Sequence, residues 1–199
     1  MKYTFGYIKH NEEVNRIHLG ASLKNLKGEF SIIATTDKCF PAENYNHILD
    51  VCETEYLILC HEDITFPDNL LEKIDETIKL VPDFGCLGIV GVDTDNKYYW
   101  SVEDRIFELD TLDCCFILIN MKNLSNARFD TDLFGEYHLY VEDFCAQMNR
   151  INGKKIYTIG GLVGEGVPLL KEPKKVKTVA HHSATVSKRG CAWGRYWEF

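Results

Sequence analysis

The sequence has no long apolar run that could anchor it in a membrane. None of its uninterrupted hydrophobic stretches approaches the roughly 20 residues that cross a bilayer. The first residues, Met1-Lys2-Tyr3-Thr4, also lack the apolar core of a secretory signal. These two absences indicate a cytoplasmic protein without a transmembrane segment, and they leave peripheral contact with a membrane surface open.

Positive charge is scarce as well. Lysine and arginine number 22 against 30 aspartates and glutamates, which gives a formal net charge of -8. Because nucleic acids are held chiefly by lysine and arginine on their phosphates, this balance argues against a nucleic acid as the main partner. A phosphate group on any ligand would instead need a metal ion or a locally basic segment.

The eight cysteines lack the spacing of a zinc knuckle. Cys114 and Cys115 are adjacent, so in a strand they would point to opposite faces of the sheet. A reduced cysteine inside an apolar pattern behaves as a small hydrophobe, and we expect the following six to belong to the core: Cys52, Cys60, Cys86, Cys114, Cys115 and Cys145.

The chain is long enough for one domain with a sizeable core. It has 199 residues, of which 45% are hydrophobic, and neither an internal repeat nor a linker divides it. We therefore expect a single domain over residues 1–199.

Strands and helices are expected to alternate in the first half. Apolar and β-branched runs predict strands at residues 3–8, 30–35, 56–60 and 86–92. Helical spacing predicts helices within residues 14–28, 41–52 and 67–82, two of them opening near a proline. Such alternation implies parallel pairing through right-handed crossovers. The fold class is α/β, with a mostly parallel central sheet flanked by helices, and residues 1–92 form a nucleotide-binding half.

The second half, residues 93–199, has a mixed pattern. Short polar-edged segments at 97–101 and 105–109 precede a continuous apolar run at 114–119 that suits a buried strand. A helix then places four residues on one face, and a strand follows at 155–159. These four residues are Phe144, Cys145, Met148 and Ile151.

A polar triplet, His61-Glu62-Asp63, directly follows the apolar run at 56–60 and precedes Pro67. Open α/β sheets bind ligands at the carboxyl ends of their strands, where this triplet is expected. Carboxylate oxygens suit Mg²⁺ or Mn²⁺, and these ions commonly hold a substrate diphosphate. The alternative is a solvated turn whose acids only favour the N-terminus of the next helix.

A second acidic pair, Glu142-Asp143, opens the late helix beside His138 and Tyr140. One of these carboxylates is a candidate general base, and the neighbouring imidazole and phenol suit a sugar or another polar ligand. The alternative role is electrostatic, because a helix N-terminus favours negative charge.

Two further segments carry polar side chains. Asp110 and Asp113 precede the run at 114–119, where they would accept hydroxyl hydrogen bonds or simply close a turn. His181 and His182 follow four lysines, at 171, 174, 175 and 177, so this segment is either a metal and diphosphate site or a solvated basic loop.

Taken in order, these segments resemble the family 2 inverting glycosyltransferases of the GT-A fold. Residues 30–37 resemble the second strand, with an acid at its end, and residues 43–48 resemble the following helix entry. His61-Glu62-Asp63 resembles the Asp-x-Asp metal motif, in a subgroup that reads His-x-Asp. Asp113 lies in a stretch resembling the sugar pocket, and residues 129–143 resemble the segment that ends in the acid-base carboxylate.

The resemblance implies a role for each candidate. Asp143 would be the base; Asp37, Asn46, His61, Glu62 and Asp113 would bind the donor; His138, Tyr140 and Glu142 would bind the acceptor; Asp63, His181 and His182 would hold the metal. It implies Mn²⁺ or Mg²⁺ as cofactor, and as partners a nucleotide-diphosphate sugar, a UDP-sugar above others, and a carbohydrate acceptor. Two other classes stay open: a metal-dependent hydrolase and a non-catalytic nucleotide-sugar binder.

Overall fold

The computed structural model describes residues 1–36, 40–101, 105–133 and 139–161. Residues 1–162 form one compact unit, and residues 163–199 lie outside the described part. The single domain over the whole chain and its division at residue 92 therefore stay predictions.

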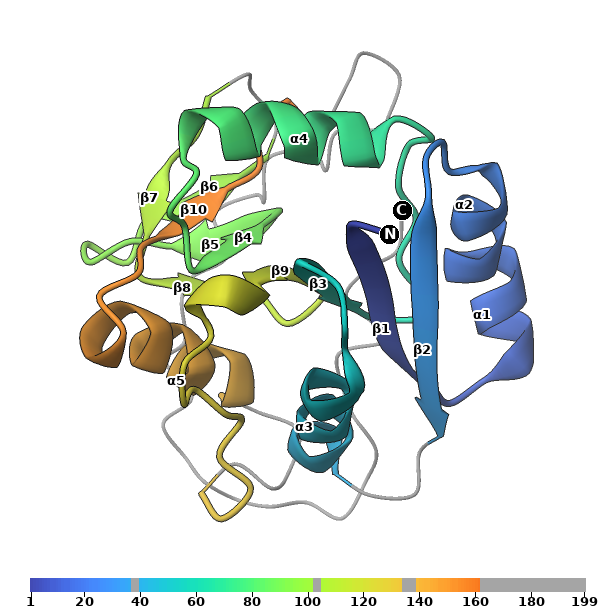
Figure 1. The fold of residues 1–199 in the computed structure, drawn as a ribbon, viewed down its shortest axis with the longest axis horizontal. Helices are drawn as coiled ribbons and strands as arrows, with labels where there is room; N and C mark the ends of the chain where they lie inside the picture. Colours follow the sequence, from blue (N-terminus) through green and yellow to red (C-terminus); the bar gives the residue numbers. More distant parts are fainter. Residues whose placement is uncertain (37–39, 102–104, 134–138, 162–199) are drawn as a thin grey trace, which may run out of the picture. The chain divides into compact units, whose positions relative to one another are not determined.

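The described strands and helices follow the expected alternation at first and then become mixed (Figure 1). In chain order they are β1 (Tyr3–Lys9), α1 (Glu12–Ile17), α2 (Leu19–Asn25), β2 (Phe30–Thr36), α3 (Pro41–Val51), β3 (Tyr56–Cys60), α4 (Leu70–Leu80), β4 (Cys86–Gly88), β5 (Val90–Val92), β6 (Tyr98–Trp100), β7 (Glu108–Leu109), β8 (Thr111–Leu112), β9 (Phe116–Asn120), the 3₁₀ helix η1 (Met121–Asn123), α5 (Tyr140–Ala146), the π-helical turn η2 (Gln147–Ile151) and β10 (Ile156–Thr158).

Seven of the described strands form the central sheet, in the order β2-β1-β3-β9-β4-β10-β7. β1 pairs in parallel with β2 and β3, and β4 with β10, whereas β9 lies antiparallel between β3 and β4. β7 is antiparallel at the edge. Five strands thus share one direction, and the prediction of a mostly parallel sheet is confirmed. A smaller sheet of β6, β5 and β8 forms beside it.

The two faces of the sheet carry separate cores because successive side chains of a strand alternate. In β3, Leu57 and Leu59 belong to one core, and Ile58 and Cys60 to the other. All residues of β3 and β9 are buried, as the unbroken apolar runs predict for strands covered on both faces.

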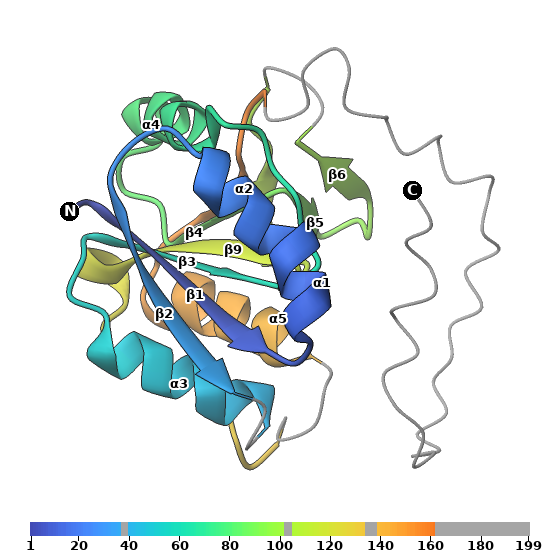
Figure 2. The ribbon, with the colours of Figure 1, turned by 90° about the vertical axis from the view of Figure 1, so that its right-hand side faces the viewer.

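Helices cover both faces of the sheet, as Figure 2 shows: α3 and α5 lie on one side, and α2 and α4 on the other. α3 begins at Pro41, whose fixed backbone angle suits the first helical turn, and buries Ile48 completely. α4 buries Leu70 and Ile74 completely. Each such side chain contributes about 1.5–3 kcal/mol to folding.

Two predicted elements are divided in the structure. The helix expected within 14–28 is split into α1 and α2, because the N–H of Leu19 donates to the carbonyl of Glu62 at 3.3 Å instead of continuing the first helix. The strand expected at 86–92 is split into β4 and β5. The chain leaves the central sheet after Gly88, since β5 pairs with β6 and β8.

The prediction that Ile151 lies on the buried face of the late helix was wrong. Ile151 is 76% exposed, whereas Phe144, Cys145 and Met148 are buried as expected. The cause is the π-helical turn η2, in which the N–H of Asn152 donates to the carbonyl of Gln147, five residues back. The extra residue in this turn rotates Ile151 away from the core.

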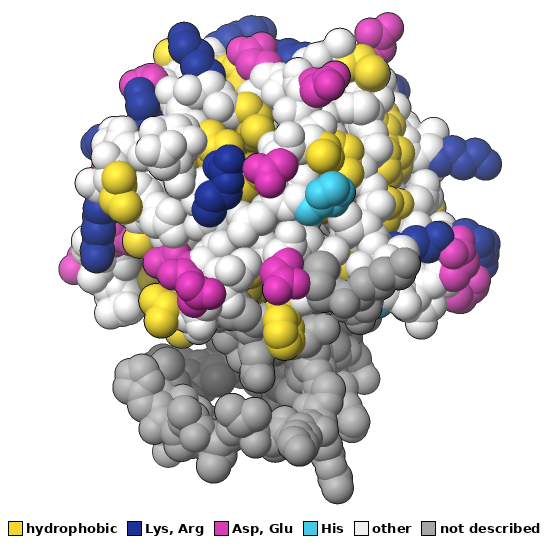
Figure 3. Space-filling model, turned by 60° about the horizontal axis from the view of Figure 1, so that its bottom comes forward, with side chains coloured by type: hydrophobic (Ala, Val, Ile, Leu, Met, Phe, Trp, Pro, Cys, Tyr) yellow, Lys and Arg dark blue, Asp and Glu magenta, His cyan; other side chains and the backbone are white. Residues whose placement is uncertain are grey.

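The six cysteines expected in the core are all free thiols. Cys60, Cys86 and Cys145 are buried, as predicted, and Cys52, Cys114 and Cys115 are partly buried. On the face shown in Figure 3, acidic and basic side chains of the described residues are interspersed. Across the described ranges, every helix is too short or too polar to cross a bilayer.

Candidate functional site

The candidate site lies at the carboxyl edge of the central sheet. The residues that follow β3 meet the residues that precede β9, because β9 runs antiparallel to β3. The backbone N–H of His61 donates to the carbonyl of Cys115 at 3.0 Å, and Asp113 Oδ1 accepts from the N–H of Cys115 at 2.8 Å. Asp113 follows His61 by 52 positions and Asp63 by 50, yet the three residues come to one edge.

His61 and Asp63 form the accessible part of this edge. His61 Nδ1 lies 3.9 Å from Asp63 Oδ1, and the two side chains are 38% and 55% exposed. Partial burial of the imidazole lowers the pKa of His61, against the opposing effect of the Asp63 and Asp113 carboxylates. A neutral imidazole beside two carboxylates suits hydrogen bonding to a polar ligand or ligation of a metal.

The metal site at this edge stays a prediction. Carboxylate oxygen suits Mn²⁺, and Asp63 supplies such an oxygen beside the imidazole of His61. Within residues 1–36, 40–101, 105–133 and 139–161, however, His, Cys, Asp and Glu do not gather in groups of three that could hold an ion. The two further predicted ligands, His181 and His182, lie outside the described residues.

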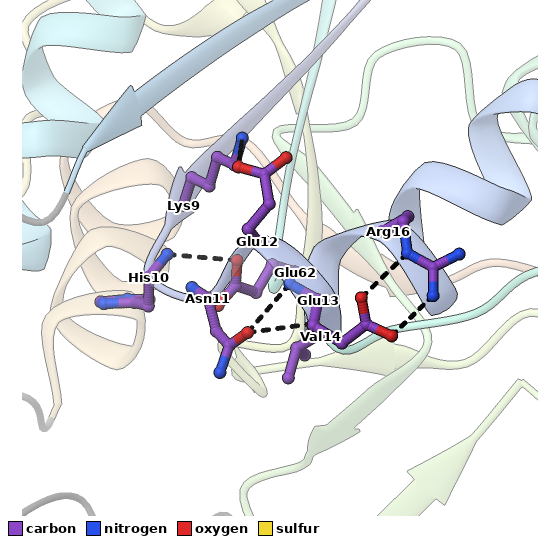
Figure 4. A network of polar contacts seen from close by, with 8 residues as sticks. All are labelled: Lys9, His10, Asn11, Glu12, Glu13, Val14, Arg16 and Glu62. Atoms are coloured by element: carbon purple, nitrogen blue, oxygen red, sulfur yellow. Dashed lines mark hydrogen bonds and ion pairs between the residues drawn. The ribbon is translucent and has the colours of Figure 1, made fainter.

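Glu62 belongs to the same triplet, but its side chain points toward the backbone that follows β1 (Figure 4). Its carboxylate, only 7% exposed, accepts hydrogen bonds from the backbone N–H groups of His10 at 3.1 Å and Asn11 at 2.8 Å. Asn11 in turn caps α1, where its side chain accepts from the N–H groups of Glu13 and Val14. Glu62 thus ties the end of β1 to the end of β3. Its predicted contact with the donor stays a prediction.

Asn46 also bonds to backbone in this structure. Its Nδ2 donates to the carbonyl of Phe129 at 2.8 Å, and its Oδ1 accepts from the N–H of Phe129 at 3.0 Å. Phe129 stacks on Phe144 of α5 with ring centroids 4.4 Å apart. Asn46 therefore joins α3 to α5 through this segment, and its role in donor binding stays a prediction.

Tyr140 opens α5 in a buried position. It is 4% exposed, and its ring lies 5.8 Å from that of Tyr45. Its hydroxyl also bonds the thiol of Cys114, and burial raises the pKa of Tyr140 and of Tyr45 above the ordinary range. The side chains of Tyr45, Tyr140 and Cys114 thus connect α3, α5 and the segment before β9. The predicted acceptor contact of Tyr140 stays a prediction.

The two acids of α5 differ in their surroundings. Glu142 is exposed, and its charge acts on the thiol of Cys114. Asp143 is partly buried, and its Oδ2 accepts a 2.6 Å hydrogen bond from Gln147 Nε2. The structure brings both acids to the start of α5. Asp37 and His138 lie outside the described residues.

Two residues of this region were not singled out from the sequence: His10 and Gln147. His10 follows β1, and its charge would act on His61. A strand end was the available signal for His10, and a helical i, i+4 spacing from Asp143 was the available signal for Gln147.

Comparisons with known proteins agree on the fold. No protein-family model matches the chain, and a search of curated proteins found no match. Among solved structures, S. aureus TarS matches with a TM-score of 0.61 and 14% identity, over 80% of this chain and 35% of that one. TarS 1–349 in complex with UDP-GlcNAc matches with a TM-score of 0.59 and 15% identity, over 83% and 60%.

A third match is GalNAc-T7 with UDP, GalNAc and Mn²⁺, with a TM-score of 0.58 and 6% identity, over 80% of this chain and 42% of that one. These neighbours are GT-A glycosyltransferases. This chain has the GT-A fold. It spans about a third to three fifths of the length of these three matched chains.

Proposed function

We propose that this protein is a glycosyltransferase that moves a sugar from a nucleotide-diphosphate donor, a UDP-sugar above others, to a hydroxyl of a carbohydrate acceptor with inversion. The observation that carries the proposal is the convergence of His61, Asp63 and Asp113 at the carboxyl edge of a GT-A sheet. Solved structures of this fold have been obtained with UDP-GlcNAc and with UDP, GalNAc and Mn²⁺.

The proposed donor site follows from the charge that develops in the reaction. The bond to the anomeric carbon breaks with positive charge on the sugar and negative charge on the departing diphosphate. A bound Mn²⁺ or Mg²⁺ would neutralise the diphosphate, and Asp63 with His181 or His182 would hold it. The neutral imidazole of His61 would donate to or accept from the donor, and the Asp113 carboxylate would accept hydroxyl hydrogen bonds of the sugar.

The remaining donor residues have two kinds of role in this proposal. Asp37 would bind the base or ribose. Asn46 and Glu62 would act through the backbone segments that they hold, since their polar atoms bond Phe129 in one case and His10 and Asn11 in the other.

The proposed acid-base chemistry belongs to the start of α5. Asp143 would take the proton from the acceptor hydroxyl, which then attacks the face of the sugar opposite the diphosphate and inverts the anomeric centre. Glu142, His138 and Tyr140 would surround the acceptor.

The test is release of nucleotide diphosphate from a panel of UDP-sugars with Mn²⁺, with and without oligosaccharide acceptors. We expect acceptor-dependent release, and loss of that release in Asp143→Asn. If no acceptor accelerates the release, the result would favour a hydrolase over a transferase. Tight binding of the donor without turnover would replace it with a nucleotide-sugar binder.

A further inference from the structure

We infer that Gln147 is the positioning residue for the carboxylate of Asp143, held in place for that purpose by the backbone of Arg128. The inference rests on the proposed function, in which Asp143 is the base. It adds a residue that acts on the base and touches neither substrate.

Three hydrogen bonds join the carboxamide of Gln147 to two other described residues, Asp143 and Arg128. Nε2 donates to Asp143 Oδ2 at 2.6 Å and to the carbonyl of Arg128 at 2.8 Å. Oε1 accepts from the backbone N–H of Arg128 at 3.1 Å. A single side chain therefore joins the first turn of α5 to the segment before Phe129.

These contacts determine which end of the amide faces Asp143. If the amide were turned over, its oxygen would face the carbonyl of Arg128 and its NH₂ group would face the N–H of Arg128, so both bonds would be lost. The backbone of Arg128 thus requires the NH₂ group to point at Asp143. Gln147 is an obligatory donor to the carboxylate, unlike an ordinary exposed i, i+4 partner that is free to turn away.

The segment that holds Gln147 is itself fixed to two helices. Phe129 makes two hydrogen bonds with Asn46 of α3, and its ring stacks on Phe144 of α5. The guanidinium of Arg128 lies 3.3 Å from Asp50 Oδ1, near the end of α3. The donor therefore belongs to a rigid frame, which is what an oriented base requires.

Two consequences follow for the base. Fixing Oδ2 sets the plane of the carboxylate, so Oδ1 points in one direction and can meet an acceptor hydroxyl at a defined angle. The same bond occupies Oδ2, so Oδ1 is the oxygen left to accept the proton. Gln147 thereby supports the rate of proton transfer and leaves the donor site unchanged.

The test is a double-mutant cycle on acceptor-dependent transfer by the full chain, with Gln147→Leu, Asp143→Asn and the double variant. Gln147→Leu removes a hydrogen bond to a charged group, so it should lower kcat by about tenfold or more while KM for the donor stays within about twofold. In the Asp143→Asn background the same change should have little further effect, because the carboxylate it serves is gone.

Two more variants separate positioning from folding. Gln147→Glu keeps an oxygen for the N–H of Arg128 but places negative charge against Asp143, so it should lower kcat at least as much as Gln147→Leu. Asn149→Leu, on the same π-helical turn, should leave kcat unchanged. Thermal unfolding of each variant shows whether the fold is intact.

The outcomes distinguish failure of the positioning role of Gln147 from failure of the proposed function. Fully additive losses in the double variant, or an unchanged kcat in both Gln147 variants, would overturn the positioning role alone. Full transfer by Asp143→Asn, or no transfer by the wild type, would overturn the proposed function and this inference with it.

Discussion

The carboxylate of Glu62 accepts a 2.8 Å hydrogen bond from the backbone N–H of Asn11, a residue 51 positions earlier in the chain. The neighbouring N–H of His10 donates to the other carboxylate oxygen. Two backbone donors that lie beyond the end of β1 are thus satisfied by one buried side chain. This arrangement makes Glu62 important for the shape of the site whether or not it touches a ligand.

Glu62→Gln should destabilise the protein. Glutamine offers one oxygen for the two N–H groups, and its own NH₂ group faces the other. One backbone donor therefore loses its partner next to a buried side chain, at a cost of about 1 kcal/mol or more. Urea unfolding measures the free energy of unfolding. Glu72→Gln, an exposed position on α4, is the control and should change it by less than about 0.5 kcal/mol. Equal stabilities of the two variants would contradict this account of Glu62.

Asp63→Ala should abolish the Mn²⁺-dependent part of nucleotide-diphosphate binding and leave the fold intact. The side chain is 55% exposed at the end of β3, so its loss removes a ligand oxygen without opening a cavity. Calorimetric titration of UDP with and without Mn²⁺ measures the effect. Glu76→Gln, on the exposed side of α4, is the matched control. Unchanged Mn²⁺-dependent affinity in Asp63→Ala would remove this residue from the metal site.

Asp143→Asn should lower transfer by about a hundredfold or more, with donor affinity near that of the wild type. Asparagine keeps the shape and accepts the bond from Gln147, but it cannot take a proton. Glu142→Gln is the comparison, because adjacent helical residues point about 100° apart and only one of the two carboxylates should reach the hydroxyl that loses its proton. Loss of transfer in Glu142→Gln alone would move the base by one residue.

The free energy of unfolding should fall as the pH rises above about 9, in part because of Cys114. Burial, with the Asp113 charge as a second cause, raises the pKa of Cys114 from 9.0 to about 12. Between these two pH values the unfolded chain has released a proton that the folded protein retains, so rising pH favours unfolding. The thiol's contribution is fully present below pH 9 and is lost as the pH approaches 12.

Urea unfolding at pH 8 and pH 10.5 tests this prediction. Cys114→Ala should show a smaller fall in stability between the two pH values than the wild type. Other groups that titrate in this range are common to both proteins, so the difference between them isolates Cys114. Identical falls would show that this thiol does not differ between the folded and unfolded states.

Gly91→Ala should disturb the strand that leads to Asp113. A Cβ at Gly91 would lie 2.3 Å from the backbone oxygen of Thr111 and 2.5 Å from Leu109 Cδ1. Because β5 pairs with β8 here, backbone must move, and we expect a loss of about 1–3 kcal/mol in the free energy of unfolding. Asp95→Ala, in the turn after β5, should have little effect. If Gly91→Ala leaves the free energy of unfolding unchanged, β8 can move to make room for the added methyl group without destabilising the fold.

Local patterns in the sequence predicted those parts of the fold that local physics determines. The buried run of β3 and the helix opened by Pro41 were placed within a residue or two of their observed bounds. The division of α1 from α2 could not be predicted, because it depends on the bond from Leu19 to Glu62, 43 positions along the chain. The exposure of Ile151 depends on a π-helical turn that no spacing rule for α-helices contains.

The candidate site shows the same limit. The sequence placed His61 and Asp63 at a strand end, which the structure confirms. It did not show that the acidic side chain between them turns inward, since alternation in a loop is not set by strand geometry. It also did not indicate a partner for Asp143. Gln147 donates to Asp143 because the backbone of Arg128, in a different segment, orients its amide.

The position of β9 has a consequence for how the chain acquires its fold during synthesis. β3 and β4 both belong to the first 92 residues, yet they do not pair with each other, since β9 occupies the place between them. While the ribosome is still making residues 93–115, each of these two strands has an open edge at the centre of the future sheet. Open edges of this kind recruit other chains. A fragment cut at residue 92 would keep them permanently, so the first half of this protein is a poor choice for expression by itself.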